Sequence, residues 1–119
     1  MRENKLNSFK RINEASNLVR IGNRSGSHRG CIRINPSNSY EHEKAKFDEC
    51  YELAKNGKEY LTEAIFHNGK RADILVLDEN RVIEILHTEK LEEAKEKVKG
   101  YPGGLDIEFK ETGGKDDRI

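Results

Sequence analysis

Between residues 60 and 87, three segments dominated by apolar residues follow one another, separated by two short polar turns. In the first segment, alternation with a period of two places Leu61 and Ile65 on one face, and the third segment alternates in the same way. The first turn contains Asn68 and Gly69, a pair that readily adopts the positive φ angles of a tight hairpin. The pattern therefore predicts an antiparallel three-stranded meander.

Helical patterns flank this meander. A helix over residues 40–56 is predicted by the capping residue Ser39 at its start and by Gly57 just past its end. Its expected apolar stripe consists of Phe47, Cys50, Tyr51 and Ala54. A second helix is predicted over residues 89–99, and alternation over 105–109 predicts a final strand. The order helix, three-stranded antiparallel meander, helix, strand indicates an α+β fold with mixed α/β/α layers around one sheet.

The two ends of the chain differ from this central part. Residues 1–27 show no sustained period and finish in a Gly- and Ser-rich run, so we expect a flexible basic N-terminal arm. Its composition is compatible with a simple disordered tail and with an arm that contacts phosphate groups. Residues 28–110 are expected to form the folded domain, beginning with a short extended segment, and residues 111–119 a polar tail.

Composition sets further limits on the class of protein. The 119 residues suit one domain, and a hydrophobic content of 34% predicts a small core. Positive and negative residues balance at 22 each, although residues 1–33 carry eight Lys or Arg against two Glu. Two cysteines exclude a disulfide scaffold, and no zinc spacing occurs. Without a signal peptide or a membrane-length apolar run, we expect a cytoplasmic protein; the Glu- and Lys-rich, Trp-free composition is typical of a thermophile.

One acid interrupts each segment of the predicted meander: Glu63, Asp73 and Glu84. An ionised carboxylate at an apolar position is costly unless it is paired or bound to a cation. The separation of Asp73 and Glu84 suits one strand, a hairpin turn and a return, so both can face one Mg²⁺ or Mn²⁺ ion. Surface ion pairs are the alternative, Asp73 with Arg71 and Glu84 with Lys70 or Arg81. A three-acid site requires all three carboxylates to converge within metal-bridging distance.

His42 and Lys46 lie one turn apart on the predicted helix 40–56. This line of the helix could overlook the sheet, but spacing alone favours a solvated helix edge.

At these positions the chain resembles a known family. Asp73, ten intervening residues and Glu84-Ile85-Leu86, on a hairpin after a capped helix, resemble the PD-(D/E)XK nuclease superfamily. Competence CoiA-like nucleases are similar in a narrower set: the HxxxK spacing of His42 and Lys46, Glu63, Arg71-Ala72-Asp73, Glu84-Ile85-Leu86-His87-Thr88 and Tyr101. The resemblance covers residues 40–101, about half of the chain.

This resemblance implies a restriction-endonuclease-like core and a metal-dependent nuclease that cleaves phosphodiester bonds of DNA. Asp73 and Glu84 would be ligands of Mg²⁺ or Mn²⁺, with Glu63 as a third acid. His42 and Lys46 would be the accessory pair on the helix, so all five residues would be catalytic.

Three departures from the family pattern bear on activity. The lysine expected two residues after Glu84 is Leu86, which can neither orient water nor neutralise charge. Lys46 would have to fill that role, or the site is inactive. The proline expected before Asp73 is Ala72, which fits the same extended backbone, and no cysteine cluster precedes His42.

Two other interpretations stay open beside a nuclease. One is a catalytically degenerate nuclease fold that acts as a nucleic-acid-binding or assembly module. The other is an unrelated α+β protein whose acids form surface ion pairs. The expected partner is nucleic acid, DNA rather than RNA, with no membrane and with homodimer formation left open. The candidate phosphate contacts are Arg24, Arg29, Arg33, Lys70 and Arg71.

Overall fold

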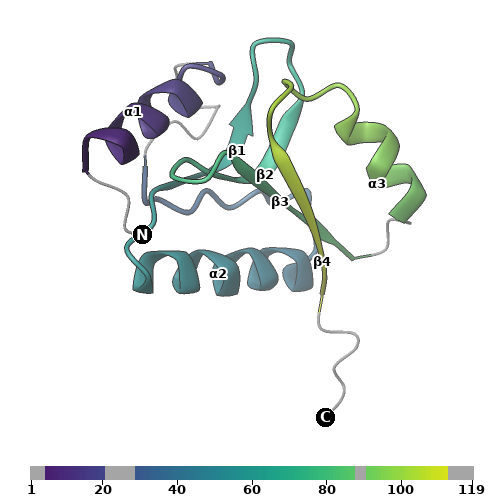
Figure 1. Ribbon diagram of the computed structural model, residues 1–119. Coiled ribbons are helices and arrows are strands. Elements are labelled where there is room, and N and C mark those ends of the chain that lie inside the picture. The colour runs from purple at the N-terminus through teal and green to yellow at the C-terminus, as the bar shows by residue number, and fades with distance from the viewer. Residues whose placement is uncertain (1–4, 21–28, 88–90, 113–119) are drawn as a thin grey trace.

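One four-stranded sheet organises the structure, and helices cover both of its faces (Figure 1). The computed structural model describes residues 5–20, 29–87 and 91–112. The elements in chain order are α1 (Lys5–Ser16), α2 (Tyr40–Lys55), β1 (Tyr60–Ile65), β2 (Arg71–Val76), β3 (Arg81–Leu86), α3 (Leu91–Val98) and β4 (Asp106–Glu111). Within these ranges, no helix has both the length and the apolar character needed to cross a membrane.

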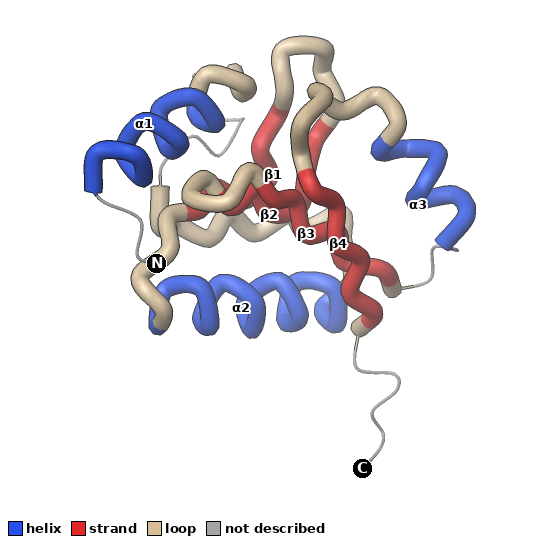
Figure 2. The backbone as a smooth tube through the Cα atoms, viewed as in Figure 1, coloured by secondary structure: helices blue, strands red, loops and turns tan. Residues whose placement is uncertain are grey.

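The sheet has the order β1-β2-β3-β4. Strands β1, β2 and β3 pair antiparallel, and β4 pairs parallel to β3 after the crossover through α3 (Figure 2). The predicted meander, both predicted helices and the final strand are therefore confirmed, with bounds shifted by a few residues. The molecule is an α+β protein with a mixed sheet.

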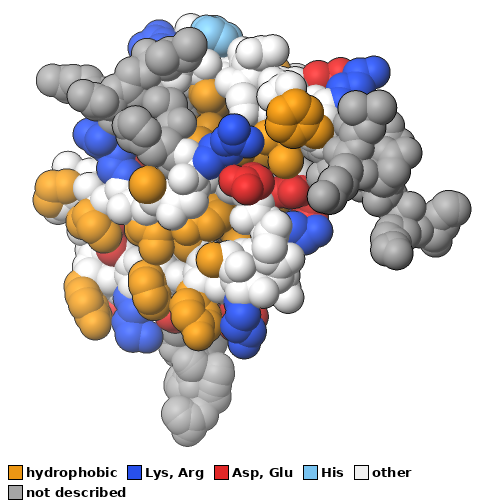
Figure 3. Space-filling model, turned by 90° about the vertical axis from the view of Figure 1, so that its left-hand side faces the viewer, with side chains coloured by type: hydrophobic (Ala, Val, Ile, Leu, Met, Phe, Trp, Pro, Cys, Tyr) orange, Lys and Arg blue, Asp and Glu red, His pale blue; other side chains and the backbone are white. Residues whose placement is uncertain are grey.

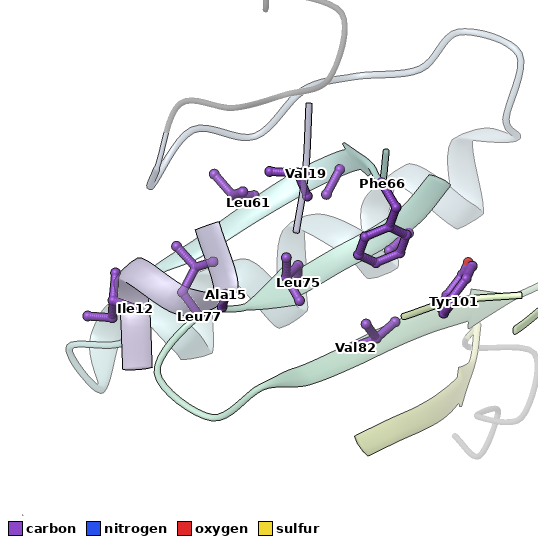
Figure 4. Close-up of a cluster of buried hydrophobic side chains, with 11 residues drawn as sticks. Ile12, Ala15, Val19, Leu61, Phe66, Leu75, Leu77, Val82 and Tyr101 are labelled. Atoms are coloured by element: carbon purple, nitrogen blue, oxygen red, sulfur yellow. The ribbon is translucent and has the colours of Figure 1, made fainter. Parts of the chain in front are cut away.

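Two apolar clusters hold the layers together. On one face of the sheet, Cys50 and Leu53 of α2 pack against inward residues of β2 and β3, such as Ile74 and Ile83. On the other face, α1 and the region around α3 and Tyr101 pack over a second cluster (Figure 4). Its labelled members are Ile12, Ala15, Val19, Leu61, Phe66, Leu75, Leu77, Val82 and Tyr101. Opposite faces of β2 thus serve opposite layers, as a period of two requires.

The expected flexible arm over residues 1–27 is wrong for residues 5–20. Ile12, Ala15 and Val19 are buried against the sheet, and Val19 forms an isolated β-bridge with Phe66. Ile12 and Ala15, one turn apart on α1, and Val19 just after the helix attach this segment to the core. The folded unit therefore begins before residue 28, and at the other end it extends to the buried Thr112. Residues 1–4, 21–28 and 113–119 lie outside the described part.

Of the stripe predicted for α2, Cys50 is confirmed as buried, and the other three members are wrong. The helix buries Glu43, Lys46, Cys50 and Leu53, and it exposes Phe47, Tyr51 and Ala54. Glu43 and Lys46 can turn inward because their side chains contact each other at 2.7 Å, so neither charge is buried alone. A prediction based only on apolar residues at helical spacing does not consider that two paired charged residues can be buried. It therefore placed Phe47 and Tyr51 in the core.

Candidate functional site

Strands β2 and β3 separate at Asp73 and Glu84. Their pairing runs from Val76 only as far as Ile74, which lies opposite Ile83. Beyond that point, the carboxylates take over the backbone hydrogen bonds. The N–H of Ile85 donates to Asp73 Oδ2 at 2.8 Å, and the N–H of Asp73 donates to Glu84 Oε2 at 3.2 Å. The two acids thus fill a fork between the strands, which places them side by side.

Glu84 is the more enclosed of the two acids. Lys97 of α3 donates to Glu84 Oε1 at 3.0 Å, and the Tyr101 hydroxyl lies 2.9 Å from Glu84 Oε2. Burial, and then the charge of Asp73, raise the pKa of Glu84 to about 7, although Lys97 and Tyr101 act in the opposite direction. Near neutral pH, this carboxyl is balanced between its two protonation states. The carboxylates of Asp73 and Glu84 lie so close together that ionisation of one disfavours ionisation of the other.

Asp73 faces a polar pocket of about 260 Å³. The pocket is lined by Ser37, Asn38, Ser39, His42, Asp73, Ile85, His87 and Lys97. His42 Nε2 lies 3.4 Å from Asp73 Oδ2, and His42 Nδ1 lies 2.8 Å from Glu43 Oε2. Burial lowers the pKa of His42, but contacts with Asp73 and Glu43 more than offset this and leave it above the ordinary value. An imidazole held between two carboxylates is thus fixed in orientation beside Asp73.

Lys46 is fully buried in a second charge cluster. Its ammonium contacts Glu43 Oε1 at 2.7 Å, the Arg33 carbonyl at 2.8 Å and Glu63 Oε2 at 3.0 Å. These three acceptors match its three N–H donors. Burial alone would raise the pKa of Glu43, but hydrogen bonds from Lys46, the Asn35 backbone and other neighbours bring it to about 2. The prediction of a solvated helix edge at Lys46 is wrong, because this edge faces the sheet.

Glu63 belongs to that second cluster. Its backbone is in the left-handed region, with φ at 51°, and Ala64 opposite Ala72 resumes the pairing with β2 after it. A non-glycine residue in this region marks local strain, here in the middle of β1. The Glu63 carboxylate contacts Lys46, the Asn35 side chain at 3.1 Å and Arg71 at 3.5 Å.

A metal site with all three acids is therefore not what the structure shows. Across residues 5–20, 29–87 and 91–112, no group of three or more His, Cys, Asp or Glu side chains is placed to hold an ion. The structure places Glu63 with Lys46 and not beside Asp73 and Glu84, so its role as a third ligand stays a prediction without support from this geometry. Asp73 and Glu84 alone still fit Mg²⁺ or Mn²⁺, because such ions commonly take one or two carboxylates and complete their shell with water and substrate oxygens. A bound cation would offset the repulsion between the Asp73 and Glu84 carboxylates, which helps to raise the pKa of Glu84.

Sequence reasoning missed Lys97. Its place near the end of the helix suggested only a favourable interaction with the helix dipole. In the structure, it reaches Glu84 and lines the pocket. The available signal was indirect: the strand position two after Glu84 is the buried Leu86, and α3 is the next element along the chain.

The candidate phosphate contacts are spread over the surface. Arg29 and Arg33 are exposed in the segment beside β1, while Lys70 and Arg71 lie where β2 begins. Arg71 is half exposed and also approaches Glu63. Arg24 lies outside the described residues. Their contact with nucleic acid stays a prediction.

Comparison of the chain with protein-family models, with curated proteins and with solved structures finds no match.

Proposed function

We propose that the chain is a metal-dependent nuclease that cleaves phosphodiester bonds, with DNA as the expected substrate and a restriction-endonuclease-like core. One observation carries the proposal: Asp73 and Glu84 are held together where β2 and β3 separate, beside a polar pocket. Burial and the nearby Asp73 raise the pKa of Glu84 to about 7. Strongly perturbed carboxyl groups beside a cleft are typical of functional sites. The family resemblance of residues 40–101 points to the same chemistry.

Asp73 and Glu84 would hold a Mg²⁺ or Mn²⁺ ion, which lowers the pKa of bound water and stabilises negative charge on a phosphate. His42 would keep Asp73 oriented through the 3.4 Å contact at Oδ2. Lys97 supplies positive charge at the pocket wall, next to the site where phosphate charge would grow. Tyr101 holds Glu84 in place from the interior, since its hydroxyl also lies 2.7 Å from the Arg71 carbonyl.

The cation that compensates for Leu86 is, in this proposal, Lys97 rather than Lys46. All three N–H donors of Lys46 have buried acceptors, so a contact with substrate would cost it one of them. Lys97 is 39% exposed, and it lines the pocket. Lys46 acts through the fold, by neutralising Glu43 and Glu63.

The test is cleavage of end-labelled single-stranded and duplex DNA, with RNA in parallel, in Mg²⁺, in Mn²⁺ and in EDTA. Asp73→Asn and Glu84→Gln should reduce metal-dependent cleavage to background, because each removes a ligand charge and keeps the side-chain shape. Glu92→Gln, an exposed acid on α3, is the matched control. Titration calorimetry with Mn²⁺ should show weaker binding in the first two variants and not in the third.

Lys97→Met should slow cleavage by about 10²–10³-fold, as the loss of one group that stabilises developing charge commonly does. Lys95→Met, an exposed lysine on the same helix, should cleave like the wild type. Absence of metal-dependent cleavage in the wild type, with nucleic-acid binding intact, would instead establish the degenerate binding module. Cleavage that survives Asp73→Asn and Glu84→Gln would refute the assigned site.

A further inference from the structure

The hairpin between β1 and β2 lies in a basic part of the molecule. Three segments meet around its tip: residues 15–20 from the end of α1, residues 64–72 of the hairpin and residues 97–101 from the end of α3. The chain as a whole is neutral, but these segments contain no Asp or Glu and five Lys or Arg residues: Arg20, Lys70, Arg71, Lys97 and Lys99. In Figure 1 the hairpin projects at the top of the molecule, beside the loop after α3. At the same end, Figure 3 shows a histidine and a Lys or Arg side chain.

The tip of the hairpin is held from two sides. On one side, the Arg20 guanidinium donates to the His67 carbonyl at 3.4 Å. On the other side, the Asn68 side chain donates to the Gly100 carbonyl at 2.6 Å. The stem of Lys70 crosses Gly100 so closely that a Cβ there would lie 2.8 Å from Lys70 Cδ. Because the hairpin is tied to both neighbouring segments, a ligand that binds its basic side chains would not have to order the backbone.

The positive charge at the tip faces solvent. Lys70 is exposed, and it forms no ion pair with the residues that the structure describes. Arg71 lies 3.5 Å from Glu63, but the arginine side chain is 50% exposed and the glutamate 3%, so a ligand meets the positive group. Lys99 is exposed and pairs with Glu96 at 2.7 Å. The excess charge at the tip is therefore positive, which suits an anionic partner.

The tip also adjoins the proposed cleavage site. Arg71 is the first residue of β2 and lies two positions before Asp73. The Tyr101 hydroxyl lies 2.7 Å from the Arg71 carbonyl and 2.9 Å from Glu84 Oε2. Lys97, where the third segment begins, contacts Glu84 and lines the polar pocket. A phosphodiester chain with one phosphate in the pocket would thus have neighbouring phosphates close to the hairpin.

We propose that the hairpin tip, through Arg20, Lys70 and Arg71, binds the phosphate backbone of the nucleic acid beside the cleaved bond. This inference rests on the proposed function, because it takes nucleic acid as the substrate. Lysine and arginine contacts with phosphates position a nucleic acid and carry no sequence information, so binding is independent of sequence. A protein partner is disfavoured, because protein interfaces depend on large apolar anchors. Of the exposed large apolar side chains in the described part of the chain, none belongs to the three segments.

The test is fluorescence anisotropy of a labelled DNA duplex with the full chain in EDTA, so that nothing is cleaved, over a series of NaCl concentrations. For the wild type, the logarithm of the binding constant should fall linearly with the logarithm of the salt concentration. Lys70→Gln and Arg71→Gln should each reduce this slope by about 0.9, and the double variant by about twice as much. The matched control is a double variant of Lys44→Gln and Lys55→Gln. It removes the same charge from the exposed side of α2 and should keep the wild-type slope.

The proposal is overturned if the folded variants Lys70→Gln and Arg71→Gln keep the wild-type slope, or if the control lowers it as much. Lys70→Gln decides alone if Arg71→Gln does not fold by circular dichroism, because Lys70 is exposed and lies outside the buried charge cluster. The proposal is also overturned if the wild type binds no DNA. Tighter binding of labelled polyglutamate than of DNA would overturn it too, since an acidic protein segment would then be the partner.

Failure of the nuclease proposal is a separate result. A slope that falls in the hairpin variants, without any cleavage by the wild type in Mg²⁺, would support the binding surface and refute the nuclease. Cleavage in Mg²⁺ with an unchanged slope in the hairpin variants would do the reverse.

Discussion

Replacement of Lys46 by methionine tests whether the buried charge cluster stabilises the fold. Methionine fills a volume similar to the lysine stem and removes the ammonium. Glu43 and Glu63 would then remain at the α2–sheet contact without their shared cation. We expect a folded but much less stable protein at pH 7, because an uncompensated buried carboxylate is costly.

The magnitude follows from two independent estimates. The drop in the Glu43 pKa from 4.5 to about 2 corresponds to at most about 3 kcal/mol of stabilisation, and Lys46 is its largest favourable cause. Removal of one partner from a buried ion pair typically costs about 3–5 kcal/mol. An expected loss of about 3 kcal/mol is a large fraction of the roughly 5–15 kcal/mol by which a domain of this size is stable.

Urea unfolding followed by circular dichroism measures the free energy of unfolding of each variant. Lys44→Met is the matched control: the two side chains share a helix, but Lys44 is 58% exposed and Lys46 0%. The control should lose no more than about 0.5 kcal/mol, as exposed pairs at this spacing do. The deficit of Lys46→Met should also depend on pH. Glu43 contributes stability that is present above about pH 4.5 and is lost as the pH falls toward 2, so the two curves should converge in acid.

A loss below about 1 kcal/mol for Lys46→Met at pH 7, or a loss equal to that of Lys44→Met, would refute this reasoning. A deficit that stays constant from pH 7 to pH 2 would mean that lost packing, rather than charge, explains the change.

Two further predictions concern other parts of the structure. As the pH rises from about 4.5 to 7, the free energy of unfolding of the metal-free protein should fall by up to about 3 kcal/mol more than that of Glu84→Gln, because the folded state holds the Glu84 proton more tightly than the unfolded state does. Urea unfolding in EDTA at pH 5 and pH 8 measures this difference. An equal change in the free energy of unfolding of both proteins would contradict the prediction. Ile12→Ala should cost about 2–4 kcal/mol in the same assay while Phe9→Ala stays within about 0.5 kcal/mol, and equal effects would mean that α1 does not belong to the core.

The sheet could be predicted from sequence because its signals are local. Alternation over six residues and the Asn68-Gly69 turn specify strands and a hairpin with few competing solutions. The acids Asp73 and Glu84 were identifiable for a related reason, since each interrupts an otherwise apolar strand. Each of these predictions depends on residues close together in the chain.

The errors arose where charges compensate one another over long separations. Glu43, Lys46 and Glu63 neutralise one another, so α2 buries two charged residues beside Cys50 and Leu53 and exposes Phe47 and Tyr51. Nothing within helix 40–55 reveals a partner on β1. Lys97 was missed for the same reason, because it meets Glu84 across 13 residues and a change of element.

The contacts of the two clusters form one series that runs from Arg71 at the sheet surface to α3. When His42 is protonated, the members alternate in charge almost throughout: Arg71, Glu63, Lys46, Glu43, His42, Asp73, Glu84 and Lys97. The alternation breaks at a single step, where Asp73 meets Glu84, and that step adjoins the polar pocket. The carboxyl with its pKa raised to about 7 is found at this break. Every other step of the series joins opposite charges, so the step between Asp73 and Glu84 is where an added cation would gain most.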